Sequence, residues 1–346
     1  MTRSFLLPIP HVLNANDIGR RVVAPKTGPC LYFPPMDESA LSPARNACPH
    51  PLVRAPRVAT IGTRPAARLH PAPPGLQGAI AVILSRDARE CQLSDEQRLT
   101  HFPASPVMSL SWFSGQWVGT VETEGSGWCW RPYGASLVIA GSRSEPTVTW
   151  SPTNGYGGMI CFTPDIARTL FGLDPAAVHD RFVPAHDALG DHWRSFLDAL
   201  ESAADDTVVL SAIAEHVGPR WRSIEGRTAA QPTLRELGRH WVQRLALQSR
   251  EWQRGLSARQ AERRIKAFSG RSLRDWQSLV RTEGVFFAAR DRFEAGLPFD
   301  WAGIAQDEGF ADQAHLSRAV RRITGFPPSA QRFVEDESFW VYRLWV

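Results

Sequence analysis

The spacing of apolar residues changes twice along the chain, and each change marks a predicted boundary. Before residue 76 no regular period is present, and 14 of the 27 prolines in the chain lie there. Proline lacks a backbone donor and fixes φ, which disfavours both helix and central strand. We therefore expect residues 1–76 to form a proline-rich leader that is extended and partly disordered.

Residues 77–205 have the pattern of short strands. Apolar residues alternate or cluster in short runs, and Gly, Pro, Asn and Ser separate the runs. Many short strands with turn residues between them favour a small antiparallel sandwich or barrel. The predicted strands are Ala79–Ser85, Val107–Phe113, Trp117–Glu122, Ser136–Ala140, Thr147–Trp150 and Met159–Phe162, and the closing helices are Asp165–Phe171 and His186–Ser202.

After residue 205 the spacing lengthens towards the helical period of 3.6 residues. Residues 206–231 contain a predicted helix over Val208–Val217 and the breakers Gly218-Pro219, Gly226 and Gln231-Pro232, so we interpret them as a linker region. Residues 232–336 are predicted to be entirely helical, and residues 337–346 form an aromatic tail. The fold class is therefore α+β with several domains. The predicted helices are Thr233–Ser249, Ser257–Phe268, Leu273–Ala295, Trp301–Asp307, Asp312–Thr324 and Ser329–Asp336.

Composition excludes several classes of protein. A hydrophobic fraction of 43% with 21% charged residues is typical of globular chains. The longest apolar run, near Ala79–Leu84, is far shorter than the ~18 residues of a membrane span, and Met1–His11 lacks the features of a secretion signal. Five cysteines without a Cys-x-x-Cys pair disfavour a disulfide framework and a zinc ribbon. We expect a soluble cytoplasmic protein without a metal, another cofactor or a membrane partner.

Arginine carries nearly all of the positive charge, since Lys26 and Lys266 are the only lysines in the sequence. The formal net charge is a modest +4. The planar fork of arginine suits bidentate contacts to phosphate or guanine. Whether the arginines serve nucleic-acid binding therefore depends on their positions.

The segment Trp301–Arg318 has the pattern of a helix–turn–helix unit. Ile304 and Ala305 give a short helix a small apolar face, Gly309 is placed to end it in a left-handed cap, and Phe310 fills the crossing. Asp312 is placed to cap the next helix. That helix buries Leu316, Val320 and Ile323 and presents Gln313, Ser317, Arg318, Arg321 and Arg322 to bases and phosphates.

A second unit of the same kind precedes it. Ser257 is placed to cap a helix whose core face is Ala261, Ile265 and Phe268. The opposite face carries polar and basic side chains that suit the donors and acceptors of a major groove. These side chains are Arg259, Glu262, Arg263 and Lys266.

Residues Thr233–Arg332 resemble the double helix–turn–helix DNA-binding domain of the AraC/XylS family of bacterial transcription regulators. The resemblance rests on GFADQAHLSR at positions 309–318 and on TGFPPS at positions 324–329, where the glycine, the aspartate, His-x-x-Arg and Gly-x-x-Pro have the family's spacing. Ala261, Ile265 and Val320 depart from it, because the family usually has larger side chains there.

The resemblance implies a mechanism without chemistry. In the family, two recognition helices enter successive major-groove segments and a long helix, here Leu273–Ala295, joins them. Gly284 inside it costs about 1 kcal/mol relative to alanine and predicts a bend or weak point. The resemblance places Arg259, Glu262, Arg263, Gln313, Ala314, Ser317 and Arg318 at base-facing positions, with Ser257 and Asp312 as helix caps near phosphate.

The same resemblance implies partners. Double-stranded DNA is the first, and RNA polymerase, a small-molecule effector and a second copy in a homodimer are the others. The implied function is an effector-responsive, sequence-specific activator that is not an enzyme.

The region before the linker resembles amino-terminal domains that accompany some regulators of this family, over Gly78–Ser85, Leu93–Pro106 and Phe162–Leu173. Such domains are β-rich, cupin-like sensors or dimerisation units. Two interpretations of the tryptophans among the predicted strands stay open: they fill the core, or they line the mouth of an effector pocket. The four that would form such a pocket are Trp112, Trp117, Trp128 and Trp130.

An enzyme that uses the helical domain only for DNA targeting is the alternative function. Its candidate nucleophile is Cys129 or Cys161, the latter with His101 or His186 as base. A metal at Cys30, Cys48 and His50 is disfavoured by the prolines between them. We expect the aromatic tail to dock on its own helical domain.

Overall fold

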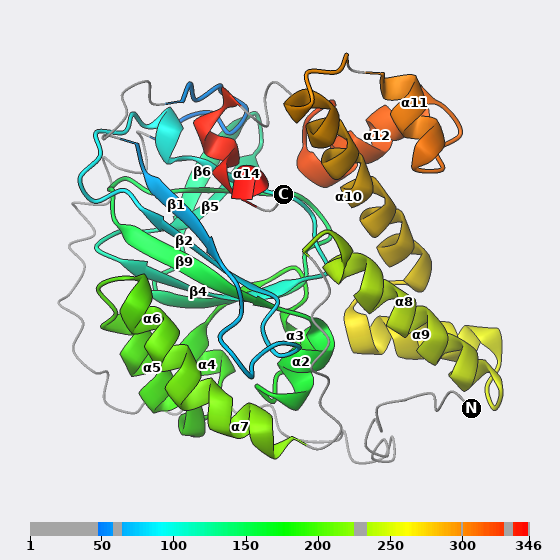
Figure 1. Cartoon of the computed structure of the whole chain (residues 1–346), viewed down its shortest axis with the longest axis horizontal. Helices are drawn as coiled ribbons and strands as arrows, with labels where there is room; N and C mark the ends of the chain where they lie inside the picture. The colour runs from blue at the N-terminus through cyan, green and yellow to red at the C-terminus, as the bar shows by residue number, and fades with distance from the viewer. Residues whose placement is uncertain (1–47, 58–63, 225–233, 299, 329–334, 345–346) are drawn as a thin grey trace.

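Two antiparallel sheets form the first part of the molecule and a group of helices forms the second (Figure 1). The structure is a computed structural model that describes residues 48–57, 64–224, 234–298, 300–328 and 335–344. Most of the predicted leader, Cys30 and most of the predicted helix Ser329–Asp336 lie outside these residues. The order of a β-rich region followed by a helical region agrees with the predicted fold class.

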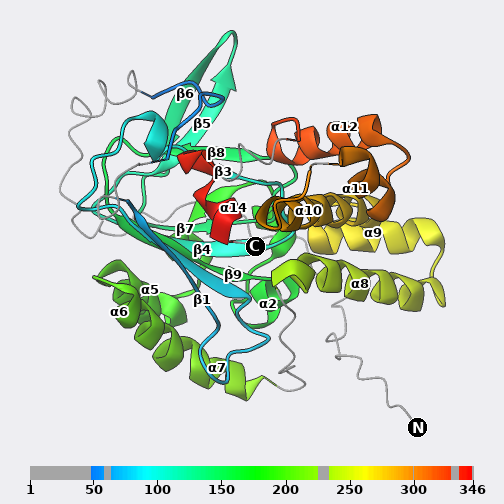
Figure 2. The same cartoon turned by 45° about the horizontal axis from the view of Figure 1, so that its top comes forward.

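The larger sheet has six strands and the smaller sheet has four. Every strand pairs antiparallel with its neighbours. The six-stranded order is β1 (Ala66–His70), β2 (Val82–Asp87), β9 (Tyr156–Phe162), β4 (Met108–Ser114), β7 (Leu137–Ala140) and β10 (Phe182–Pro184); the four-stranded order is β3 (Thr100–Phe102), β8 (Thr147–Trp150), β5 (Gly119–Glu124) and β6 (Gly127–Pro132). The β5–β6 hairpin projects from the body of the molecule (Figure 2).

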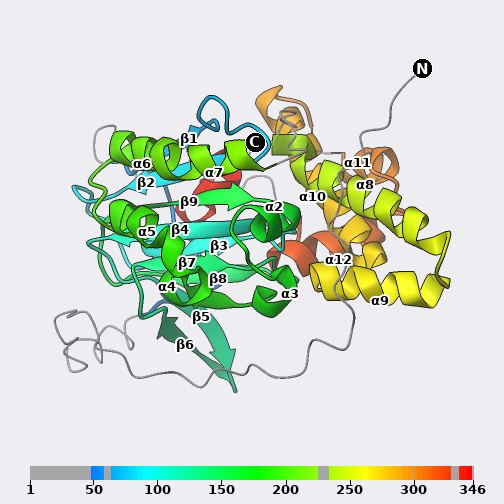
Figure 3. The ribbon, with the colours of Figure 1, turned by 90° about the horizontal axis from the view of Figure 1, so that it is seen from below.

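One face of the six-stranded sheet is apolar because of strand alternation. Leu110 on the central strand β4 pairs with Ile139 on one side and Ile160 on the other, and all three are buried. Side chains on one face of neighbouring strands stack in this way and require a cover. Short helices lie over this face (Figure 3). They are α2 (Pro164–Thr169), α3 (Pro175–Val178), α4 (Ala185–Ala188), α5 (Arg194–Glu201), α6 (Asp206–Ala212) and α7 (Gly218–Ser223), with a π-helical turn at Ile213–Val217 between the last two.

The helical part of residues 206–223 packs on the sheet although it falls in the predicted linker region. Val209, Ile213, Val217 and Trp221 are buried in the same apolar core as Leu110. These apolar residues recur at helical spacing, so the segment has a face to bury and is held by that burial.

The helices of the second part are close to those predicted. α8 and α9 pack with the first half of α10 around Trp276, and α11 and α12 pack with its second half around Val285. Gly284 lies within α10, which is continuous through it, and its Cα faces the carboxylate of Glu308. The elements are α8 (Leu234–Gln253), α9 (Ala258–Ser269), α10 (Leu273–Glu294), α11 (Trp301–Asp307) and α12 (Gln313–Thr324).

The aromatic tail contacts both parts. After a turn of 3-10 helix at Glu337–Phe339, α14 (Trp340–Leu344) packs on the sheets, and the Trp340 indole Nε1 donates to Thr100 Oγ1 at 3.0 Å. Phe339 stacks on His101 of β3 and contacts Phe326, which follows α12. The predicted docking on the helical domain is therefore only part of its contacts, because the sheets offer the larger apolar surface.

Within the described part of the chain, no helix combines the length and the apolar character that a membrane crossing requires.

Candidate nucleic-acid interface and interior cavities

The second helix pair has the local features of a helix–turn–helix unit. Asp300 Oδ1 accepts from Gly303 N at 2.9 Å and caps α11, and Gly309 has a φ of 72° where the helix ends. Phe310 is buried beside the His315 ring. Asp312 Oδ1 then accepts from His315 N at 2.6 Å, which fixes the start of α12. Gly309 and Asp312 therefore act at the predicted residues, and Asp300 is a cap that the sequence analysis did not predict.

The two faces of α12 differ sharply. Leu316, Val320 and Ile323 are buried against α10, as predicted. The opposite side is exposed at Gln313, Ala314, Arg318, Arg321 and Arg322 and half-buried at Ser317. The Arg322 guanidinium already makes one hydrogen bond within the chain, because its Nη2 donates to Ser278 Oγ on α10 at 2.8 Å.

The first helix pair is built in the same way. Ser257 and Gln260 form a capping box, in which Gln260 N donates to Ser257 Oγ and Ser257 N donates to Gln260 Oε1. Ala261 and Ile265 are fully buried, and Gly270 ends α9 with a φ of 83°. The outer face is exposed at Arg259, Arg263 and Lys266 and half-buried at Glu262.

The basic side chains on these outer faces are not neutralised by the part of the chain that the structure describes. Among the described residues, no carboxylate lies within 4.0 Å of Arg259, Arg263, Lys266, Arg318 or Arg321. Arginines elsewhere on the surface are commonly paired, as Arg131 is with Glu122 at 2.6 Å. Unpaired exposed cations on two helices provide a surface for phosphates and base edges.

The long helix α10 holds the two units apart. Its first half packs on α9 and its second half packs on α11 and the start of α12. Figure 1 shows the two units along α10, and Figure 3 shows α9 and α12 on one side of it. With 22 residues at 1.5 Å each, α10 is about 33 Å long.

The four tryptophans predicted as a pocket do not come together. Trp112 lies in the core under the helices, and Trp130 packs against Trp150 between the strands of the smaller sheet. Trp117 and Trp128 are exposed. Trp112 and Trp130 therefore fill cores, which is the first of the two interpretations left open by the sequence, because alternate positions on their strands face inward.

An apolar cavity of about 150 Å³ lies where the sheets meet the helical part. Ser109, Val138 and Ala140 line it from the larger sheet, and Phe286, Phe287 and Ile323 line it from α10 and α12. A backbone hydrogen bond from Ala104 N to Ile323 O, at 2.9 Å, ties its rim to the end of α12. Sequence reasoning missed this cavity because its walls come from segments more than a hundred residues apart.

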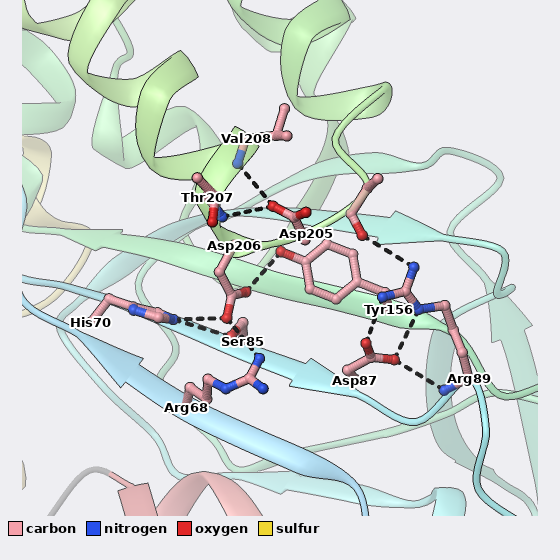
Figure 4. Close-up of polar contacts among 11 residues, drawn as sticks. Arg68, His70, Ser85, Asp87, Arg89, Tyr156, Asp205, Asp206, Thr207 and Val208 are labelled. Carbon is pink, nitrogen blue, oxygen red and sulfur yellow. Dashed lines mark hydrogen bonds and ion pairs between the residues drawn. The ribbon is translucent and has the colours of Figure 1, made fainter.

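A Ser–His–Asp group on the larger sheet tests the enzyme alternative (Figure 4). His70 Nε2 lies 3.0 Å from Asp206 Oδ2 and 3.5 Å from Ser85 Oγ, so one nitrogen serves both partners. A nucleophile relay uses the two ring nitrogens separately. Tyr156 also donates to Asp206 at 2.8 Å. The group joins the start of α6 to β1, β2 and β9 and is a structural contact.

The candidate nucleophiles are held in their protonated form. Burial raises the pKa of Cys161 to about 12, and burial also raises the pKa of Cys129. The thiolate is the reactive species, so neither residue is activated. Of their candidate bases, His101 stacks on Phe339, and His186 Nε2 lies 3.8 Å from Glu201 Oε2.

Two groups with metal-binding side chains do not define a site. His50 packs its ring on Trp128 rather than turning to Cys48. His186, Asp198 and Glu201 each bring one ligand atom within 4.8 Å of the others on the surface of α4 and α5. Solvent-facing carboxylates often cluster without an ion, and we assign none here.

Comparisons with known proteins find similar solved structures but no matching sequence. The chain matches no family model and no curated protein sequence. Among solved structures it is similar to ToxT from Vibrio cholerae, with a TM-score of 0.34 and 10% identity over 78% of this chain and 98% of that one.

Two further ToxT structures give similar values. ToxT with a bound unsaturated fatty acid has a TM-score of 0.32 and 11% identity over 69% of this chain and 94% of that one. ToxT bound to (E)-4-(8-methylnaphthalen-1-yl)but-3-enoic acid has a TM-score of 0.31 and 10% identity over 68% and 97%. At scores this low the likeness carries no argument about function.

Proposed function

We propose that the protein is a sequence-specific DNA-binding transcription regulator of the AraC/XylS type. The observation that carries the proposal is the pair of capped recognition helices, α9 and α12, whose exposed faces bear unneutralised basic side chains. Arginines that contact phosphate supply affinity, and side chains that reach base edges supply specificity. No chemistry on the DNA is required.

The length of α10 supports reading of two groove segments. The two units pack on its first and second halves, and a helix of about 33 Å is long enough to place them against successive major-groove segments, which lie ~34 Å apart on one face of B-DNA. Of the proposed base-facing residues, Glu262 and Ser317 are half-buried and the other five remain exposed with the sheets docked. The proposed site is therefore asymmetric and spans about two helical turns, with one recognition helix in each segment.

The apolar cavity is the proposed effector site. Its walls belong to the sheets on one side and to α10 and α12 on the other. A ligand that fills it contacts the helix that spaces the two recognition units, so differential binding shifts their arrangement. An activator, a homodimer and an RNA polymerase contact are further proposals that rest on the family resemblance alone.

Selection of bound sites from a random duplex pool by the full-length protein tests the proposal. We expect enrichment of one asymmetric site of about two turns. Arg263→Ala and Arg318→Ala should each lose about 1–3 kcal/mol on the selected site and much less on scrambled DNA. Arg131→Ala, which removes an equal charge from the β5–β6 hairpin, is the matched control and should bind like the parent.

Two results would contradict the proposal. Equal losses of Arg263→Ala and Arg318→Ala on selected and scrambled DNA would show that these side chains contact only phosphates. A pool that remains random after selection would exclude a sequence-specific regulator.

A further inference from the structure

A second cavity, of about 80 Å³, lies against the apolar one inside the sheet region. Phe102, Phe113, Val118, Thr149 and Met159 line both cavities, so the two cavities adjoin along these residues. We call the larger cavity the apolar compartment and the smaller one the polar compartment. The polar compartment is lined by Arg86, Arg98 and Asn154 together with Gln116, Trp150 and Trp340.

Three buried polar atoms in the polar compartment have no hydrogen-bond partner among the described residues. They are Arg86 Nε, Arg98 Nε and Asn154 Oδ1, two donors and one acceptor. Asn154 is oriented by its other end, because its Nδ2 donates to Cys91 O at 2.5 Å. An unsatisfied buried polar atom costs about 1–3 kcal/mol, so this compartment favours a polar occupant.

Each guanidinium group in the polar compartment already has a carboxylate partner. Arg86 Nη2 pairs with Glu337 at 3.0 Å, which also pairs with Arg343 at 3.3 Å, and Arg98 Nη2 pairs with Asp95. A carboxylate placed there would meet two guanidinium groups that are already paired and the lone pairs of Asn154 Oδ1. A neutral group that both accepts and donates hydrogen bonds matches the two donors and the acceptor instead.

We propose that the two compartments form one ligand site with a fixed polarity. The apolar body of the ligand lies in the apolar compartment against α10, and an un-ionised head that accepts and donates, such as a carboxamide, lies against Arg86, Arg98 and Asn154. The size of the apolar compartment suits one six-membered ring, since a cavity of about 150 Å³ in another protein takes up benzene.

The site joins the ligand to the tail as well as to α10. Trp340 lines the polar compartment, and Val341 and Tyr342 line the apolar one. Arg86 holds Glu337, which precedes α14, and lies 5.4 Å above the Trp340 ring. A head bound at Arg86 therefore contacts the segment that continues from the second recognition unit. This regulatory role rests on the proposed function, whereas binding of the ligand does not.

Calorimetry on the full-length protein with three probes tests the head chemistry. Benzamide has a ring and the required head, toluene lacks the head, and benzoate carries a charged acceptor without a donor. We expect benzamide to bind at least about tenfold more tightly than toluene or benzoate, which corresponds to one satisfied hydrogen bond. Equal affinity of benzamide and toluene, tighter binding of benzoate, or no binding of any probe at millimolar concentration would overturn the proposal.

Variants test the orientation. Arg98→Lys keeps the charge opposite Asp95 but removes the Nε donor, and Asn154→Leu removes the acceptor; each should weaken benzamide about tenfold. Arg143→Met probes the other end of the site, because Arg143 lines the apolar compartment and its Nη1 is also buried without a partner. It should weaken the binding of benzamide less than Arg98→Lys does. A large loss in Arg143→Met with none in Arg98→Lys would place the head at Arg143 and overturn the orientation.

DNA-site selection by the same variants separates this inference from the proposed function. Variants that no longer bind benzamide but select the same DNA site as the parent would leave the proposed regulator function standing. A parent protein that binds benzamide but enriches no DNA site would leave the ligand site intact and overturn the regulator.

Discussion

A single carboxylate determines where α12, the second proposed recognition helix, begins. Asp312 Oδ1 accepts from His315 N at 2.6 Å and satisfies one of the four N–H groups left free at a helix start. The same position lies next to Gln313 and Ala314, which are proposed to face the bases. The order of the proposed recognition surface therefore depends on this cap.

Asp312→Ala should loosen α12 without unfolding the chain. Loss of an N-cap costs about 1 kcal/mol, which corresponds to roughly fivefold faster amide hydrogen exchange when exchange occurs by local opening. Exchange in α12, measured by mass spectrometry on the full chain, checks this. Asp307→Ala removes the same charge from an exposed position at the end of α11 and should leave exchange in α12 unchanged; equal acceleration by both would refute the cap.

Caps and helix stops were predictable from single residues, whereas the residues of the polar compartment were not. Ser257, Asp312 and Gly309 act on backbone groups within three or four positions, so their roles are visible in the sequence. Arg86, in β2, and Asn154, in the loop before β9, line one cavity although they lie far apart in the chain, and in the sequence each looks like an ordinary polar strand or turn residue. The spacing of residues along the chain does not show which distant residues line the same cavity.

At the level of elements, α9 docks on the sheet region through His179. The Nδ1 of His179 lies 2.8 Å from Ser142 Oγ, and its ring lies 5.9 Å from that of Trp276. Gly270, at the end of α9, is in close contact with the same ring. Burial lowers the pKa of His179 from its ordinary 6.5, in spite of Asp180 at 3.2 Å and assisted by Arg271 and Arg143.

This contact should weaken in acid. Because the folded state holds the pKa of His179 below 6.5, the unfolded state binds more protons as the pH falls through 6.5, and stability is lost until the pH reaches the lowered value. The melting temperature should therefore fall more between pH 7.5 and 5.5 in the parent than in His179→Gln, whose side chain does not titrate. Parallel declines in the two proteins would contradict this role of His179.

The four strands that the pattern did not predict are the four edge strands, β1, β10, β3 and β6. An edge strand pairs on one side only and is held in place by that neighbour. Its own apolar and polar residues therefore need not alternate strongly. β6 begins with glycine and ends with Pro132, which is tolerated at an edge. The six predicted strands are central, and their apolar residues are buried between the packed layers of the molecule.

For the whole molecule, Phe339 is a fully buried link between the two parts. Its ring is stacked 4.6 Å from that of His101 on β3 and lies 5.2 Å from the rings of Phe326 and Tyr342. It follows the second helix–turn–helix unit and precedes the segment that lines both compartments. Sheet region, helical region and cavity walls therefore share this side chain.

Phe339→Ala should destabilise the chain by about 3–5 kcal/mol, the usual cost of removing a buried aromatic ring. Because the ring contacts both parts, we expect thermal unfolding followed by circular dichroism to lose sheet and helix signals together at a lower temperature. Leu247→Ala, at an exposed position on α8, is the control and should melt like the parent. Unchanged melting of Phe339→Ala would show that the tail does not join the two parts.

The sequence by itself determined the features that depend on neighbours within a turn or two: the central strands, the helices of the second part, their caps and the polarity of α9 and α12. Periodicity and capping act over three or four residues, so they can be seen without a fold. Only the tertiary structure decided the edge strands, the place of the tail and the two compartments. Those features join residues as far apart as Arg86 and Glu337, 251 positions along the chain, and packing rather than local preference brings them together.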